Sequence, residues 1–199
     1  LWWRWRVGLK TANGFVKNQL NGRLQKTFVS LYSPLKETDR LLNNIYCGSV
    51  AIPNCKNPVF NIQAPITDNV KDILKMMQGY VICAVAPGSK MPVKRWDIGK
   101  YEILGKQLKD TFPELFLLIT GGPEDEKIGE RLIEVWGDRS YSAAGKISVA
   151  ETYSLLIKAS LLVGNDSGNM HLAAAAGVPC VAIFSAREVE NLWSPYGIK

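Results

Sequence analysis

The sequence predicts an α/β fold, a Rossmann-like doubly wound parallel sheet with helices on both faces. From residue 81 onward, short apolar runs alternate with amphipathic stretches of helical period. The runs are apolar almost throughout, as in strands that are covered on both faces. A Gly or Pro turn and a helix start signal usually follow each run, which is typical of crossover connections between parallel strands.

The first strand is predicted at Val81–Ala86, where a Pro-Gly turn ends an apolar run. An Asp can cap the helix predicted over 97–110, whose apolar residues fall on one face. Leu115–Thr120 is the second apolar strand and ends in Gly-Gly. The helix predicted over 123–137 begins with Pro and three acidic residues, which suit the positive end of a helix, and it stops near a Gly.

A short strand around Tyr141–Ala143 is expected to complete the sheet. The spacing Ser-x-x-Glu is a capping box and predicts a helix over 148–160. Leu161–Val163 is a short strand that runs into a glycine turn. Small residues form the helix predicted at Asn169–Ala176, and Val181–Phe184 is the last strand.

The composition is that of an ordinary globular protein: 199 residues, 47% hydrophobic and 21% charged. It excludes a disordered tail, a collagen and a coiled coil. The net charge of +6 favours anionic partners without choosing among them. Four cysteines without a CxxC motif are expected to be reduced thiols. No apolar run reaches the length of a membrane span, and the expected location is the cytoplasm.

Ligands of such sheets bind beyond the carboxyl ends of the strands, where the turn at 164–171 opens a helix. Backbone N–H groups at a helix start point toward a bound anion. Gly168 allows close approach, Ser167 adds a hydroxyl, and Asp166 can accept hydrogen bonds from sugar hydroxyls. Helix capping alone also explains Asp-Ser-Gly at this position. His171 is the single histidine and has no second ligand at a useful spacing, so no metal site is predicted.

Two further loops lie on the same predicted rim. The loop 87–96 carries Ser89, Lys90 and Lys94 near a helix start, where cations can bind phosphate. It matches neither the P-loop nor GxGxxG, and a solvated basic turn is the alternative. In the loop after the second strand, Glu124 can bind ribose hydroxyls or simply complement the helix dipole.

Leu1–Arg6 is cationic and aromatic, a composition that suits membrane surfaces or nucleic acid, but structural packing is the favoured interpretation.

Together these loops resemble glycosyltransferase family nine, the ADP-heptose:lipopolysaccharide heptosyltransferases. The resemblance covers about residues 81–197. The matching elements are Pro87-Gly-Ser with Lys94-Arg-Trp96, Gly121-Gly-Pro-Glu124, Ala144-Gly-Lys146 with Ser148, Asn165 to Ala174, Gly177-Val-Pro179, and Val181–Phe184. Arg6–Leu9 and 36–42 match more loosely, as a late strand of the first domain and the helix before the second.

The resemblance implies one half of a GT-B glycosyltransferase, a fold of two Rossmann-like domains that face a cleft. Residues 1–80 would be the remnant of a truncated, acceptor-side N-terminal domain with its linker helix, and 81–199 the donor-binding domain. The implied donor-binding residues fall into four groups. They are Ser89 and Lys94 at the diphosphate, with Lys90 in the same basic loop; Glu124 at the ribose; Asp166, Ser167 and Gly168 at the sugar and phosphates; and Met170 and His171 lining the site.

The implied reaction is inverting transfer of heptose from ADP-heptose to the lipopolysaccharide inner core, without a cofactor. In the family the catalytic base lies in a Gly-Asp element after the first strand, and no such element precedes Arg6. The catalytic residue is therefore expected outside this chain, which would be inactive alone. Because the chain begins at Leu1, about one domain is expected to be missing in front, and the end at 197–199 is expected to cut the closing segment.

Three other functions stay open from sequence. The chain could be a non-catalytic nucleotide-sugar binding protein of GT-B type, or a GT-B transferase that uses another nucleotide sugar. Nucleic-acid binding ranks last, and no nucleic-acid partner is predicted, because the basic residues form no long stripe. The positive charge favours peripheral contact with the anionic surface of the inner membrane, where the acceptor is expected.

Overall fold

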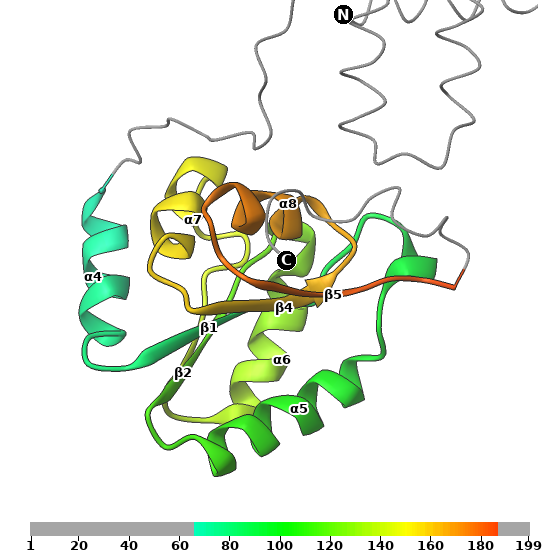
Figure 1. Ribbon diagram of the computed structural model, residues 1–199, viewed down its shortest axis with the longest axis horizontal. Coiled ribbons are helices and arrows are strands. Elements are labelled where there is room, and N and C mark those ends of the chain that lie inside the picture. Colours follow the sequence, from blue (N-terminus) through cyan, green and yellow to red (C-terminus); the bar gives the residue numbers. More distant parts are fainter. Residues whose placement is uncertain (1–65, 187–199) are drawn as a thin grey trace, which may run out of the picture. The chain divides into compact units, whose positions relative to one another are not determined.

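The computed structural model describes residues 66–186, and Figure 1 shows their arrangement. Within this range lies one parallel sheet of five strands in the order β3-β2-β1-β4-β5. The expectations for Leu1–Arg6, for Arg6–Leu9 and for 36–42 fall outside the described residues. No helix in the described part is long and apolar enough to cross a membrane.

The strands are β1 (Val81–Ala86), β2 (Leu115–Ile119), β3 (Ser140–Ser142), β4 (Leu161–Asn165) and β5 (Cys180–Ile183). From β1 the chain builds outward through β2 to β3, then crosses over to add β4 and β5 on the other side of β1. This reversal beside the first strand is the doubly wound arrangement. The predicted Rossmann-like α/β fold is thus confirmed.

The helices are α4 (Asp68–Met76), α5 (Ile98–Thr111), α6 (Glu126–Trp136), α7 (Val149–Leu156) and α8 (Gly168–Ala175), with single 3₁₀ turns η1 (Pro92–Lys94) and η2 (Pro123–Asp125). The capping box that starts α7 is present, since Ser148 Oγ accepts from Glu151 N and Glu151 Oε2 accepts from Ser148 N. Gly137 ends α6 with a positive φ of 68°, which glycine adopts without strain.

Two of the boundaries that differ from the sequence prediction depend on pairing in the sheet. Helix α7 ends at Leu156, short of the predicted residue 160, because Ser160 N already donates to Ile82 O in the sheet and the chain must extend there. Strand β4 runs to Asn165, two residues beyond the prediction, because Gly164 and Asn165 still pair with Ala182 and Ile183 of β5. The longer strand carries Asn165 to the edge where ligands bind.

The two faces of the sheet have separate cores, and the residues of each strand alternate between them. On one face, Cys83 and Val85 of β1 pack with Tyr101 of α5 and Trp136 of α6. On the other face, α4, α7 and α8 cover the sheet (Figure 1). Burial on both faces explains why the strands are apolar throughout.

Helix α4 belongs to the second of these cores, through Val70 and Ile73 packed with Ile82 of β1. Thr67 Oγ1, at its N-cap, also donates to Glu151 Oε1 of α7 at 2.6 Å. The helix therefore covers the sheet of the predicted donor-binding domain, although the sequence assigned residues up to 80 to the preceding part. The domain boundary itself stays a prediction.

Candidate functional site

The loops after β1 and β4 meet at the carboxyl edge of the sheet, on the two sides of the switch in strand order. Ala86 of β1 pairs with Gly164 of β4. A Cβ at Gly164 would lie 2.7 Å from Ala86 Cβ and 2.8 Å from Ala86 O, closer than any side chain tolerates. Glycine at this position therefore lets the two strand ends approach, and with them two of the three loops that the sequence singles out.

An ion pair joins these loops. Lys94 Nζ lies 2.6 Å from Asp166 Oδ2, and the two side chains are only 14% and 6% exposed. The 3₁₀ turn η1 directs Lys94 back toward the sheet, so that residues 72 positions apart in sequence share one site. A nearly buried pair of this kind holds opposite charges ready at a strand edge, where either partner can bind a ligand of opposite charge.

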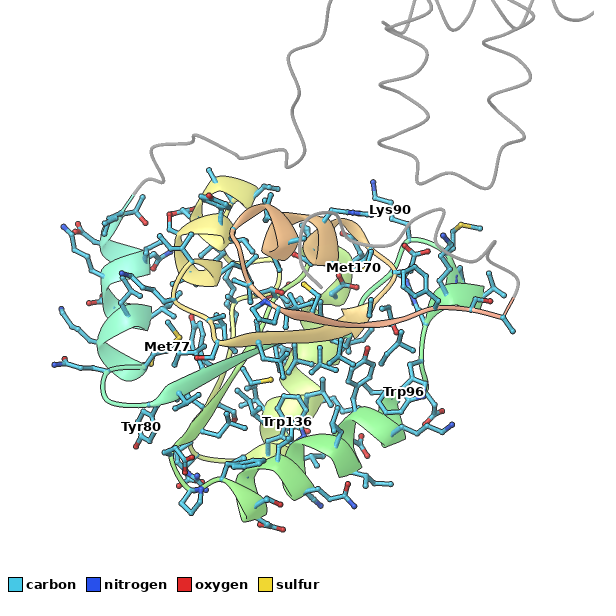
Figure 2. The ribbon with its side chains drawn as sticks, in the orientation of Figure 1. Met77, Tyr80, Lys90, Trp96, Trp136 and Met170 are labelled. Carbon is cyan, nitrogen blue, oxygen red and sulfur yellow. The ribbon has the colours of Figure 1, made fainter. Side chains whose placement is uncertain are left out.

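Ser89 lies beside this pair and is buried. Its hydroxyl donates to Asp166 O at 3.5 Å and accepts from Met91 N at 3.4 Å, while its carbonyl accepts from Arg95 Nε at 2.8 Å. Lys90, labelled in Figure 2, is exposed at the outer edge of the loop. The structure thus places Ser89 and Lys94 together with Asp166 and leaves Lys90 apart from them.

Asn165, to which sequence reasoning gave no role of its own, is buried between the same loops with no exposed surface. Its Oδ1 accepts from Trp96 N at 3.0 Å and from Tyr101 OH at 3.1 Å, and its Nδ2 donates to Pro87 O at 2.7 Å. The signal that could have found it is an amide at the end of an otherwise apolar strand.

Glu124 is exposed on the neighbouring rim segment, at the turn η2 that follows β2. The loop after β3 joins this segment, because Gly145 N donates to Gly121 O at 3.2 Å. Glu124 is therefore on the predicted rim, and no contact places it against the ion pair.

Asp125, next in the chain, lies under the rim with a buried carboxyl group. A Cβ at Gly88 would lie only 2.1 Å from Asp125 Oδ2, so this glycine leaves room for the carboxylate beneath the loop after β1. Burial raises the pKa of Asp125, the hydrogen bond from Gly122 N lowers it, and the charges of Glu124 and Arg95 act in opposite directions. Sequence reasoning saw this acid only as part of a helix start.

The start of α8 bears on the helix-capping alternative. Ser167 is at the N-cap position but makes no capping hydrogen bond, and its buried Oγ has no partner among the described residues. Asp166 directs its carboxylate to Lys94. Gly168 is exposed, and the position its Cβ would occupy is open. Capping by these side chains therefore does not account for Asp-Ser-Gly here.

The last two predicted site residues, Met170 and His171, lie in different environments. Met170 is fully buried and packs with Ala84, Ala86 and Leu162, so its side chain belongs to the core and offers a ligand no exposed surface (Figure 2). His171 is on the exposed side of α8. Partial desolvation lowers the pKa of His171, and the nearby Asp166 carboxylate opposes this shift. Within residues 66–186, no three His, Cys, Asp or Glu residues are grouped so as to hold a metal ion.

The family model for glycosyltransferase family 9 (heptosyltransferase) matches residues 52–199. A curated relative, lipooligosaccharide heptosyltransferase 2 of Haemophilus influenzae, is 31% identical over 108 residues, which cover 52% of this chain and 31% of the relative. Among solved structures, a glycosyl transferase family 9 protein from Veillonella parvula matches with a TM-score of 0.67 and 20% identity, over 83% of this chain and 48% of the other. The ADP-heptose LPS heptosyltransferase II of E. coli matches with a TM-score of 0.57 and 23% identity, over 74% and 46%.

The chain spans about a third of the length of this curated relative and somewhat less than half of the two solved chains. At 20% and 23% identity, the structural matches show the fold alone. The family model, by contrast, covers most of the chain and includes all three rim loops. The resemblance predicted from these loops is confirmed: the chain belongs to glycosyltransferase family 9.

Proposed function

We propose that this chain is the donor-binding part of a glycosyltransferase that transfers heptose from ADP-heptose to the lipopolysaccharide inner core. The observation that carries the proposal is the Lys94–Asp166 ion pair beside the open start of α8, at the strand edge of a family 9 member. A cation and free helix N–H groups at one edge suit a diphosphate, and a carboxylate beside them suits sugar hydroxyls.

In this proposal the diphosphate of the sugar donor binds Lys94 and the N–H groups at Gly168, and Ser167 Oγ donates a further hydrogen bond to it. Ser89 holds the conformation of the loop 87–96. Support comes from Ser167 Oγ, which is buried without a partner in the described structure and gains one when an anion binds. Asp166 turns from Lys94 to the sugar, and Glu124 on the neighbouring rim segment binds the ribose.

The chemistry that these residues supply is stabilisation of the leaving diphosphate. When the bond between heptose and diphosphate breaks, negative charge grows on the phosphate oxygens. An ammonium group and oriented N–H groups lower the energy of that state without reorganising. His171 and Lys90 flank the site. Met170 belongs to α8 and anchors this helix on the sheet through the core.

The catalytic base is proposed to lie outside this chain, in an acceptor-side domain. The chain alone is then expected to bind donor without transferring the sugar, and no cofactor takes part. We place the enzyme in the cytoplasm, with its net charge of +6 favouring peripheral contact with anionic lipid. Absence of co-sedimentation with anionic liposomes would remove this last point.

Isothermal titration calorimetry of the 199-residue chain with ADP, UDP and ADP-heptose tests the proposal. We expect binding of ADP and ADP-heptose, and weaker binding of UDP. Equal affinity for ADP and UDP would point to another nucleotide sugar. A folded chain that binds none of the three would refute a donor site.

A further inference from the structure

The side chain of Asn165 reaches both ends of the loop 87–96. We propose that it is a positioning residue for the donor: its amide holds this loop so that Lys94 faces the diphosphate. This inference rests on the function proposed above and extends it to a residue that contacts no donor.

The hydrogen bonds define the role. Pro87, at the start of the loop, accepts from Asn165 Nδ2 at 2.7 Å, and Trp96, at its end, donates to Asn165 Oδ1 at 3.0 Å. Ser89 and Lys94 lie between these two anchored points. One amide therefore closes the loop at its base and limits where the Lys94 ammonium can lie.

The three hydrogen bonds use both ends of the amide. Trp96 N is a donor and Pro87 O an acceptor, so the side chain between them must accept and donate at the same time, which fixes the orientation of the Asn165 amide. Tyr101 OH fills the second lone pair of Oδ1 at 3.1 Å. An apolar side chain would leave all three groups buried and unpaired, and an ionised aspartate would place two acceptors against each other at Pro87.

The neighbouring residues link this amide to the ligand site. Asn165 is the last residue of β4, and Asp166 follows it directly with its carboxylate on Lys94. Tyr101 also packs edge-on against Trp96, with ring centroids 4.9 Å apart. The end of β4, the loop after β1 and the first turns of α5 are thus joined around one buried side chain.

A double-mutant cycle separates positioning from general stability. We expect Asn165→Ala and Lys94→Ala each to weaken ADP binding about tenfold, and the double variant to bind within about threefold of the weaker single variant. If Asn165 affects binding independently of Lys94, the two losses multiply instead, and if it affects only overall stability, the folded Asn165→Ala variant binds as wild type does. Calorimetry measures the affinities, and urea unfolding checks that each variant is folded at the binding temperature.

Salt dependence gives a second readout that stability does not move. The affinity for ADP falls as salt screens the contact between Lys94 and the diphosphate. Lys94→Ala should flatten this dependence, and Asn165→Ala should flatten it to a similar degree. An unchanged salt dependence in Asn165→Ala would overturn the proposal.

Tyr101→Phe keeps the test informative if Asn165→Ala does not fold. It removes one hydrogen bond to Asn165 and keeps the ring against Trp96. We expect a loss of ADP affinity of about two- to fivefold. Tyr80→Phe is the matched control, because Tyr80 lies before the start of β1, at the opposite edge of the sheet, and no loss is expected there. If Lys94→Ala weakens binding while the Asn165 and Tyr101 variants match wild type, positioning fails alone. If wild type binds no ADP, the proposed function fails with it.

Discussion

Replacing Asp166 by Asn should strengthen the binding of ADP, although Asp166 is itself a proposed donor contact. In the structure Asp166 Oδ2 lies 2.6 Å from Lys94 Nζ, so a diphosphate that binds Lys94 must share that ammonium with a carboxylate. ADP lacks the sugar that Asp166 would bind. For this ligand the carboxylate contributes only repulsion and competition.

The magnitude follows from the geometry. A phosphate oxygen on the far side of the same ammonium would lie roughly 5 Å from the Asp166 carboxylate. At an effective dielectric constant of about 20–40, two like charges at that distance repel by about 1.5–3 kcal/mol. Part of this gain is lost because Lys94 also loses a partner. We expect a net gain of about 1 kcal/mol, roughly fivefold in affinity.

Calorimetry with ADP and ADP-heptose, on wild type and Asp166→Asn, provides the assay. The variant should bind ADP more tightly and should lose most or all of any additional affinity that wild type has for ADP-heptose. Ser160→Ala is a suitable control, because this residue precedes β4 at the opposite edge of the sheet. Weaker ADP binding by Asp166→Asn in a folded protein would refute competition for Lys94.

Three further predictions concern single side chains. Lys109 is buried and donates to Trp136 O and Asp138 O at the end of α6. Lys109→Met should therefore lower the free energy of unfolding, measured in urea, by about 2–3 kcal/mol. Lys106 is exposed on the same helix, and Lys106→Met should change this free energy by less than about 0.5 kcal/mol. Burial raises the pKa of Asp125, so its protonated form is the one the fold favours, and stability conferred by that proton is lost as pH rises through the raised pKa. Asp125→Asn should therefore gain stability relative to wild type between acid and neutral pH, and an equal pH dependence of the two proteins would contradict this. The pKa of His171, the only histidine, should lie below 6.5 when measured by NMR. This pKa should fall further in Asp166→Asn and rise when ADP binds. A pKa that ADP does not change would place His171 outside the site.

The helices and strands were predictable because hydrophobic periodicity and helix caps depend on residues that are close in sequence. Val81–Ala86 is the strand that the apolar run indicates, and Ser148 with Glu151 starts α7 as the capping box requires. Where prediction missed, a partner distant in sequence decided. The end of α7 depends on Ser160 bonding to Ile82 O, which local pattern does not reveal.

The site was predictable in outline, because parallel strands bring their carboxyl ends to one edge. From this rule the sequence predicts that Lys94 and Asp166 lie at the same edge of the sheet. It did not show that Met170 points into the core, because a helix start of small residues gives little indication of which face is buried. It also gave no role to Asn165, whose three hydrogen bonds all come from residues that only the folded chain brings near.

The separation of 72 positions between Lys94 and Asp166 has a consequence for folding. Strands β1 and β2 are joined through a single helix, whereas β4 reaches β1 only after α6, β3 and α7 have been passed. Contacts between distant segments cost the most chain entropy and tend to form late. The two halves of the site then meet only when the domain is nearly complete. A nucleotide bound between them would therefore raise the melting temperature of the whole domain and protect its central strands from hydrogen exchange.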